Sequence, residues 1–316
     1  MHIGNDVCGI PCATDRIESM DRLASGFDVQ AIIAGLRSDR LILVRNARQR
    51  DADQIMSDVA AELGMSANLE IQAAFAGIHG HRQNVSKYFM TVNRREDFAF
   101  VLPHSEGSGS SNLQLASFYC HHNSTDGGVS LLMNYDQEST AWQLIRELVT
   151  RIDPSSRPLT ATEKALARTK FWAEEFPGPQ DKFVEERRSG MEGVRFLWML
   201  APLRKGFSKV LQQEVFTYWD SIASTDLDSV TECVRLMRSF DLLREPASGP
   251  PIDYFDKAYT RATWNSGVTY RQLFKSVVLR KLEPGDLLIQ NNLTWAHAAS
   301  NWTPGSGTRN VIAAFA

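Results

Sequence analysis

The chain has 316 residues, a length that allows two domains of ordinary size or one large domain with an elaborated insert. Hydrophobic residues make up 43% and charged residues 22% of the sequence, which is typical of a globular protein and excludes a disordered one. The 34 Lys and Arg residues against 37 Asp and Glu residues leave a formal charge of −3. A balance this even argues against a protein that binds nucleic acid or an anionic membrane over its whole surface.

The first elements along the chain are predicted to be a helix, a strand and a second helix. Apolar residues recur at helical spacing over residues 27–36, and residues 41–44 form a short run typical of a buried strand. The second helix is predicted to begin at a capping residue, Asp51 or Asp53, and to end at Gly64.

From residue 98 the pattern changes to strands, which are predicted at 98–102, 113–120 and 129–133. The middle of the chain is then predicted to be helical, with the clearest helices at 140–152 and 227–243. Strands return near the end of the chain, at 276–279, 287–290 and 310–315.

Strands on both sides of a helical middle predict one domain rather than two domains in series. We therefore expect a single domain over residues 1–316, with a β core at about 98–135 and 270–316 and a helical insert at about 136–265.

The cellular setting is predicted from the absence of targeting signals. No stretch approaches the roughly 20 uninterrupted apolar residues of a membrane-spanning helix, and the first residues lack the features of a secretory signal. Cys8 and Cys12 could pair or bind metal, but no second ligand pair stands at zinc-site spacing. We therefore expect a cytoplasmic protein with reduced thiols and with neither membrane nor nucleic acid as a partner, while its oligomeric state stays open.

His104 and Glu106 carry the strongest chemical signal, because residues i and i+2 of a strand point to the same side. Two histidines and one carboxylate on one face of iron(II) leave three positions open for a co-substrate and oxygen. We predict that the second histidine is His297, just past a buried strand near the end of the sequence. Arg309 follows soon after, and its planar fork suits the carboxylate of a small dicarboxylate.

The order and spacing of these residues resemble those of the iron(II)- and 2-oxoglutarate-dependent dioxygenases of the taurine dioxygenase and clavaminate synthase-like group. The resemblance covers the N-terminal elements with residues 41–45, then 104–133, and then 285–316, and it leaves about 140–270 unmatched. It implies iron(II) and 2-oxoglutarate as cofactor and co-substrate. The residues that it implies for them are His104, Glu106 and His297 as iron ligands, Arg309 for the distal carboxylate of 2-oxoglutarate, and Ser130 for a supporting hydroxyl.

The fold that the resemblance implies is mainly β with flanking helices. It is a double-stranded β-helix, or jelly roll, with N-terminal helices packed on one sheet and the helical insert as a lid. The implied activity is an oxygenase that hydroxylates an unactivated C–H bond of a small molecule, amino-acid-derived or from specialised metabolism, with O2 consumed and succinate and carbon dioxide released. No side chain beyond the metal ligands is expected to be catalytic. Desaturation, ring closure and epoxidation remain open outcomes.

The chain departs from the family pattern in two places. Many members have aspartate where this chain has Glu106, and members that halogenate have a small residue there, so Glu106 argues against halogenation. The family often has Asp-Asn-Arg before the second histidine, whereas this chain reads Asn291-Asn292-Leu293. Asn292 and Trp295 are kept as candidates for contact with the substrate or with a metal ligand.

Other histidines fit the metal site less well. His121 and His122 are neighbours and would face opposite sides of a strand. His79 and His81 lie in a glycine-containing stretch, residues 77–81, that we interpret as a loop, with a substrate-facing role as the alternative. The Gly/Ser run at 107–111 lacks the Lys-Ser/Thr of a phosphate-binding loop and is predicted to be a mobile loop beside the iron.

Two other functions stay open at the level of the sequence. The chain could be a jelly-roll protein that binds a ligand without oxidising it, or a metal enzyme that does not use 2-oxoglutarate. In both cases Ser130 and Arg309 would have no common purpose.

Overall fold

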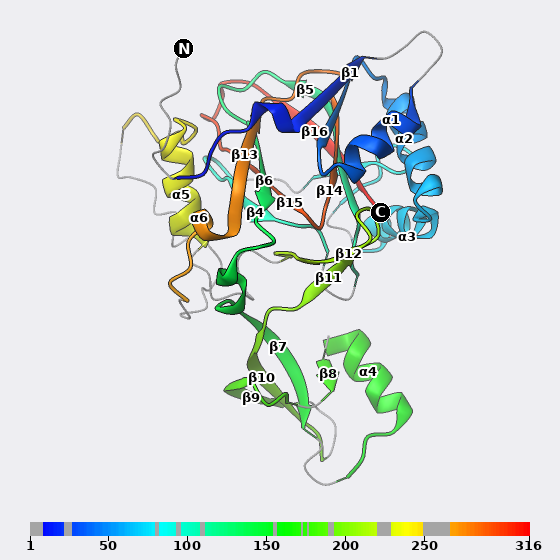
Figure 1. Cartoon of the computed structure of the whole chain (residues 1–316), viewed down its shortest axis with the longest axis vertical. Coiled ribbons are helices and arrows are strands. Elements are labelled where there is room, and N and C mark those ends of the chain that lie inside the picture. Colours follow the sequence, from blue (N-terminus) through cyan, green and yellow to red (C-terminus); the bar gives the residue numbers. More distant parts are fainter. Residues whose placement is uncertain are drawn as a thin grey trace.

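The computed structural model describes residues 9–21, 27–79, 82–92, 96–107, 111–153, 157–171, 173–175, 177–188, 193–219, 229–248 and 266–316. Most of the strands in these residues belong to antiparallel sheets, and helices flank them (Figure 1). The helices are α1 (Val29–Arg37), α2 (Gln49–Glu62), α3 (Ser66–His79), α4 (Ala161–Phe171), α5 (Ser229–Ser239) and α6 (Tyr270–Leu273), with short 3-10 turns η1 (Thr14–Arg16) and η2 (Thr140–Gln143).

A six-stranded sheet and a four-stranded sheet face each other. The larger sheet has the order β1 (Ile17–Asp21), β2 (Leu41–Arg45), β14 (Leu287–Asn291), β5 (Leu115–Asn123), β16 (Arg309–Phe315) and β3 (Met90–Thr91). The smaller sheet has the order β13 (Phe274–Arg280), β6 (Ser130–Tyr135), β15 (Trp295–Ala299) and β4 (Val101–His104). Each sheet therefore combines strands from both ends of the chain, as the predicted β core requires.

The core between the two sheets follows from the alternation of side chains along the strands. Leu41 and Leu43 of β2 point inward and pack with Leu132 of β6 and Val278 of β13. Ile42, the residue between them, points to the other side and belongs to a second cluster. This inner cluster joins the sheets into one body.

Helices cover the outer faces of both sheets. On the larger sheet, Ile33 of α1 and Ile55 of α2 belong to one buried cluster with Ile289 of β14, and Figure 1 shows α1–α3 beside this sheet. On the smaller sheet, Cys233 of α5 packs in a cluster with Ala298 of β15. A sheet buried on both faces is built from near-continuous apolar runs, which explains why these strands were recognisable from the sequence.

The prediction of a helical middle is wrong for most of the described part. Residues 146–216 form a four-stranded sheet with the order β8 (Ala173–Glu175), β7 (Arg146–Asp153), β10 (Arg195–Pro202) and β9 (Lys182–Arg188), and a hairpin of β11 (Lys205–Ser208) and β12 (Gln213–Phe216). The helix α4 packs beside β8. Figure 1 shows that α4 and the sheet of β7–β10 form a lobe that projects away from the two facing sheets.

The predicted helix at 140–152 is the clearest error. Only the turn η2 is helical, and β7 then pairs with β10 along its whole length, from Arg146 opposite Pro202 to Asp153 opposite Arg195. The β-branched residues Val149 and Ile152 favour a strand once a partner supplies the hydrogen bonds. The predicted helix at 227–243 is present as α5, which ends at Ser239.

The stretch at 77–81 is also helical where it is described. Helix α3 continues to His79, and residues 80 and 81 lie outside the described residues. Alanine, leucine, glutamate and glutamine dominate residues 67–74, and these residue types favour a helix. Residues 108–110 of the predicted mobile loop also lie outside the described part. In the described residues, no helix is long and apolar enough to cross a membrane.

Candidate metal centre

Two antiparallel strands of the smaller sheet bring the site histidines together. His104 ends β4, and His297 lies directly opposite it in β15. Residues directly opposite each other in an antiparallel pair point to the same face. Their imidazole rings are accordingly 4.4 Å apart, centroid to centroid.

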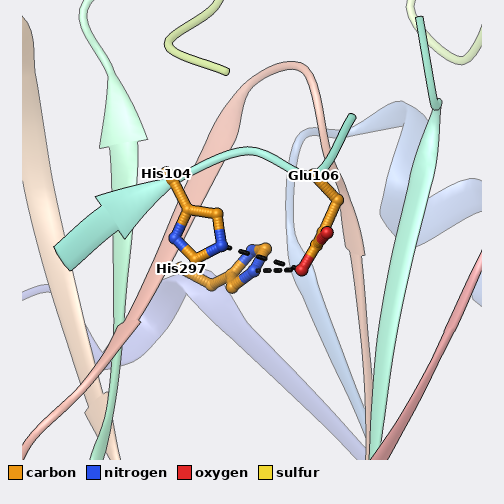
Figure 2. A group of neighbouring side chains, drawn as sticks. All are labelled: His104, Glu106 and His297. Carbon is orange, nitrogen blue, oxygen red and sulfur yellow. Dashed lines mark ion pairs between the residues drawn. The ribbon is translucent and has the colours of Figure 1, made fainter. Parts of the chain in front are cut away.

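Glu106 lies two residues beyond His104, and its carboxylate turns back towards both rings (Figure 2). Its Oε1 is 3.6 Å from Nε2 of His104 and 3.7 Å from Nε2 of His297. The three potential ligand atoms lie within 4.8 Å of one another, and among the described residues no other group of three such side chains is this close. Two imidazole nitrogens and one carboxylate oxygen are the donor set that non-haem iron(II) sites use.

The backbone fixes the orientation of the His104 ring. Its Nδ1 lies 2.8 Å from the carbonyl oxygen of Leu102, which can only accept a hydrogen bond. Nδ1 therefore carries the proton and Nε2 presents its lone pair to the site, which is the tautomer that a metal ligand requires. On the other ring, Nδ1 of His297 lies 3.3 Å from the carboxamide nitrogen of the buried Gln290, which also donates to the carbonyl of Trp295.

Asn292 holds the backbone of Glu106 in place. Its Oδ1 accepts the Glu106 N–H at 2.9 Å, and its Nδ2 donates to the Glu106 carbonyl at 3.0 Å and to the Leu113 carbonyl at 2.9 Å. The Ser105 hydroxyl donates to the backbone carbonyl of Asn292, and Ser105 and Asn292 are fully buried. Asn292 is therefore a residue that positions a site carboxylate, one of the two roles left open for it by the sequence.

The charge states in the site suit a cation. Burial would raise the pKa of Glu106, but the adjacent imidazoles of His104 and His297 and the charge of Arg82 hold that pKa well below its ordinary value. Burial lowers the pKa of His297 to about 4. Burial would also lower the pKa of His104, but the neighbouring Glu106 outweighs it and raises that pKa. At neutral pH the site therefore holds an ionised carboxylate beside a neutral His297.

Arg82 is a site residue that the sequence did not reveal. Its Nη2 lies 3.3 Å from Oε1 and 3.4 Å from Oε2 of Glu106. Arg82 immediately follows the stretch with His79 and His81, but no spacing rule connects it to Glu106. Only the folded chain brings the two together.

Arg309 and Ser130 lie at the beginnings of two strands that belong to different sheets. Arg309 begins β16, and its Nε donates to the carbonyl of Gly128 at 3.3 Å. Gly128 has φ of 65°, and a Cβ there would lie 2.9 Å from Cδ of Arg309, so the close approach requires glycine. Because Gly128 precedes Ser130 by two residues, the contact brings the arginine to the start of β6.

Ser130 faces the same side of the smaller sheet as His297. It lies opposite Ala299 in β15, while Leu132 lies opposite His297. Burial lowers the pKa of the Arg309 guanidinium to about 10. Among the described residues no carboxylate forms an ion pair with Arg309 to offset this burial. A partly buried cation without a counter-ion among the described residues is a feature expected of an anion-binding site.

Trp295 lies two residues before His297 in β15, so both side chains point to the same face of the smaller sheet. The Trp295 side chain is fully buried and packs between the two sheets with Leu132 and Cys120. Its indole N–H lies 3.1 Å from Oδ1 of Asp39. Its predicted role as a contact of the substrate or of a metal ligand stays a prediction.

The remaining histidines of the sequence have other surroundings where their side chains are described. His79 ends α3, and His81 lies outside the described residues. His122 is exposed and lies 3.0 Å from the Ser124 hydroxyl, whereas the ring of His121 packs edge-on against Tyr119. Phe118 does reach the site, because its ring centroid is 4.7 Å from that of His297.

Comparison with known proteins gave solved structures only. No family model matches the chain, and no curated protein matches it in sequence. PvcB from Pseudomonas aeruginosa is similar with 12% identity over 95% of this chain and 85% of that chain, at a TM-score of 0.42. AAD-2 in complex with Mn(II) and N-oxalylglycine is similar with 9% identity over 96% of this chain and 94% of that chain, also at 0.42.

A third structure is a putative α-ketoglutarate-dependent taurine dioxygenase from Burkholderia xenovorans, with 11% identity over 97% of this chain and 90% of that chain, at a TM-score of 0.37. PvcB is described as an Fe, α-ketoglutarate-dependent oxygenase from an isonitrile synthetic pathway. PvcB and the Burkholderia protein are thus both named as α-ketoglutarate-dependent enzymes.

Proposed function

We propose that this chain is an iron(II)- and 2-oxoglutarate-dependent oxygenase that hydroxylates a C–H bond of a small molecule. The observation that carries the proposal is the convergence of His104, Glu106 and His297, whose ligand atoms lie within 4.8 Å of one another. The donor set fits iron(II), since imidazole and carboxylate on one face leave three positions for other ligands. We also infer that the two facing sheets form a jelly roll within a single domain of residues 1–316, into which the lobe of β7–β10 and α4 is inserted.

Each of the three ligands has a distinct task in this proposal. Glu106 supplies the negative charge that offsets part of the charge of the metal, and its lowered pKa keeps it ionised at neutral pH. His297 is neutral under the same conditions because burial lowers its pKa to about 4. His104 is oriented by the Leu102 carbonyl, so only its Nε2 is available to the metal.

2-Oxoglutarate is assigned to the side of the site that Arg309 and Ser130 face. Arg309 is partly buried and has no counter-ion among the described residues, and its guanidinium can clamp the distal carboxylate with charge-assisted hydrogen bonds. The Ser130 hydroxyl would donate one further hydrogen bond to the same carboxylate. When bound, the iron and 2-oxoglutarate supply oxidation of the substrate by O2, with succinate and carbon dioxide as products.

The protein itself contributes position and exclusion of water. Phe118 packs against His297 and against Phe315, so apolar rings line the inner side of the metal centre. Low polarity there strengthens the interactions among the charged groups. No side chain beyond the metal ligands is required to transfer a proton, and O2 and a small substrate are the partners that we propose.

The experiment that tests the proposal is succinate release from 2-oxoglutarate by the Fe(II)-loaded protein under air. Amino acids, sulfonates and carrier-bound peptides would be screened as substrates, with Glu106→Ala as the inactive control. The proposal predicts metal-dependent succinate that increases with at least one substrate class. A protein that binds Fe(II) but neither binds nor consumes 2-oxoglutarate would instead be a metal enzyme of another kind, and one without metal affinity would be a ligand-binding jelly roll.

A further inference from the structure

The side chain of Glu106 could adopt several rotamers unless another group holds its carboxylate. Asn292 fixes the Glu106 backbone but does not contact the carboxylate. Glutamate loses considerable rotamer freedom when it is ordered, so a metal ligand of this length gains from a partner that orders it beforehand. The side chain of Glu106 is one methylene longer than that of an aspartate, so it has one more rotatable bond to fix.

Arg82 contacts both carboxylate oxygens, whereas both imidazoles face Oε1 alone. The Arg82 side chain is 23% exposed and that of Glu106 is 17% exposed, so solvent screens the pair only partly. One nitrogen of the arginine, Nη2, lies 3.3 Å from Oε1 and 3.4 Å from Oε2 and so bridges the carboxylate. Oε1 faces the two histidine nitrogens as well.

The backbone of the segment with Arg82 is bound to the larger sheet. The Gln83 carbonyl accepts the N–H of Thr91 at 2.9 Å, and the Gln83 N–H donates to the Thr91 hydroxyl at 3.0 Å. Met90, the other residue of β3, pairs with Ala313 of β16. Arg82 is therefore attached to a sheet edge rather than carried on a free loop.

The guanidinium is also held by the groups around it. Its Cζ lies 5.2 Å from the ring centroid of Phe315, and its Nη1 lies 3.8 Å from Sδ of Met90. The face of an aromatic ring attracts a cation, and the Phe315 ring is almost completely buried. Ring, thioether and carboxylate together restrict the guanidinium to one place.

We propose that Arg82 is a positioning residue for the metal centre: it holds the Glu106 carboxylate through both oxygens in the orientation that places Oε1 between His104 and His297. The proposal rests on the metal site proposed above. The opposite role is that Arg82 competes with the metal for the carboxylate. The two roles predict opposite changes in metal affinity when the guanidinium is removed.

The test uses the full chain, freed of metal and titrated with Co(II) while its visible absorption is followed. Arg82→Met keeps the length and the contact with Phe315 but removes the charge and the donors. Its dissociation constant for Co(II) should rise about 10- to 100-fold, the usual cost of losing a partner of a metal ligand, and the spectrum at saturation should change. Arg82→Lys should recover a large part of the affinity, because its ammonium can still hold one oxygen.

Arg45→Met is the matched control. Arg45 of β2 pairs with Asp21 of β1, and these strands lie at the edge of the larger sheet opposite to β3. It should bind Co(II) as the unmodified protein does. Thermal unfolding of each variant shows whether the fold is kept. Unchanged or tighter Co(II) binding by a folded Arg82→Met variant would overturn the proposal in favour of competition.

A double-mutant cycle with Glu106→Gln separates a role through the carboxylate from a general structural role. If Arg82 acts through Glu106, Arg82→Met should have little further effect on Co(II) affinity in the Glu106→Gln background. An equal loss in both backgrounds would overturn the proposal. If Glu106→Gln alone leaves Co(II) affinity unchanged, the metal site itself is refuted and the role of Arg82 with it. If Glu106→Gln weakens Co(II) binding and Arg82→Met does not, only the proposed role of Arg82 is refuted.

Discussion

The carboxamide of Asn292 forms a closed pair of hydrogen bonds with the backbone of Glu106, accepting its N–H at 2.9 Å and donating to its carbonyl at 3.0 Å. The two residues are 186 positions apart in the sequence. The bonds connect the loop that follows β4 to the turn between β14 and β15. They thus fix the backbone of one proposed metal ligand relative to the strand that carries His297.

Replacing Asn292 should weaken both the fold and the metal site. Asn292→Ala leaves the N–H and carbonyl of Glu106 without these partners, and each buried group left unpaired costs about 1–3 kcal/mol. Denaturant unfolding should show this loss, and Co(II) titration should show weaker binding. Asn292→Asp can accept from the N–H but cannot donate to the carbonyl. Its stability and its Co(II) affinity should lie between those of the unmodified protein and of Asn292→Ala. Equal stability and affinity in all three proteins would show that the pair is unimportant.

The three proposed ligands should be needed for metal binding more than for folding. His104→Ala, Glu106→Ala and His297→Ala should each abolish iron(II)-dependent turnover and leave the thermal unfolding midpoint nearly unchanged. Calorimetric titration with Fe(II) or Co(II) measures the loss, and the exposed His122→Ala is the control. Undiminished affinity in two of the three variants would refute the assignment.

The two residues assigned to 2-oxoglutarate should differ in the size of their effect. Arg309→Ala should raise the apparent Michaelis constant for 2-oxoglutarate strongly, because losing a buried charged partner costs roughly 2–5 kcal/mol. Ser130→Ala should cost about 1 kcal/mol, the scale of one hydrogen bond. Binding of 2-oxoglutarate to the Mn(II)-loaded protein provides a measurement independent of turnover. If Arg309→Ala left that binding intact, the carboxylate would be held elsewhere.

Metal binding should depend on pH through His104. Its pKa is raised above the ordinary value of 6.5, so below that raised pKa the metal must displace a proton from the ring. The pKa of His297 is lowered to about 4, so this ring is already neutral above about pH 5. Co(II) affinity should therefore fall as the pH drops through the pKa of His104. Calorimetry in two buffers of different ionisation enthalpy should detect close to one proton released at pH 6 and fewer at pH 9, and equal release at both would contradict this.

The same shifts affect the stability of the metal-free protein in opposite directions. A raised pKa of His104 contributes stability that is fully present below pH 6.5 and is lost as the pH rises through the folded-state value. A lowered pKa of His297 makes the folded state less stable as the pH falls from 6.5 towards 4. Denaturant unfolding of His297→Gln should show a smaller loss of stability between pH 7 and pH 4.5 than the unmodified chain. An identical loss would place the acid sensitivity in other groups.

Trp295 should matter for stability and not for the chemistry. Trp295→Phe removes the indole N–H that bonds to Asp39 and leaves a smaller ring in a fully buried place. A loss of about 1–3 kcal/mol in the free energy of unfolding is expected from the lost hydrogen bond and the reduced packing, although Oδ1 of Asp39 keeps its bond from the Thr294 hydroxyl. Affinities for Co(II) and 2-oxoglutarate should stay unchanged. A selective loss of substrate turnover would instead return Trp295 to the substrate site.

The parts of the site that were predictable follow from local rules. The two-residue period of a strand predicted that His104 and Glu106 converge; they do, although β4 ends at His104 and Glu106 lies in the loop after it. The strand predicted at 287–290 is present as β14, but the strand β15 that carries His297 was not predicted. Arg82 was not predictable, because its contact with Glu106 depends on the pairing of β3 with β16. Trp295 was a candidate because it is close in sequence to His297, and the structure places it in the core between the two sheets.

The errors in the fold have a similar cause. Strand β7 was predicted as a helix because its apolar spacing is ambiguous over a short window, and the pairing with β10 that decides the matter comes from residues far along the chain. The helix α1 and the strands β2, β14 and β16 were predicted correctly, since their apolar patterns are strong and local. These strands of the predicted β core are thus present, whereas most of the described residues predicted to form a helical insert are strands.

The most direct test of the account is anomalous scattering from crystals grown with Mn(II) and N-oxalylglycine, the pair present in one of the similar structures. The account predicts one manganese peak in contact with Nε2 of His104, Nε2 of His297 and a carboxylate oxygen of Glu106. It also predicts that the distal carboxylate of N-oxalylglycine lies against Arg309. A peak away from these three side chains, or an analogue bound far from Arg309, would contradict it.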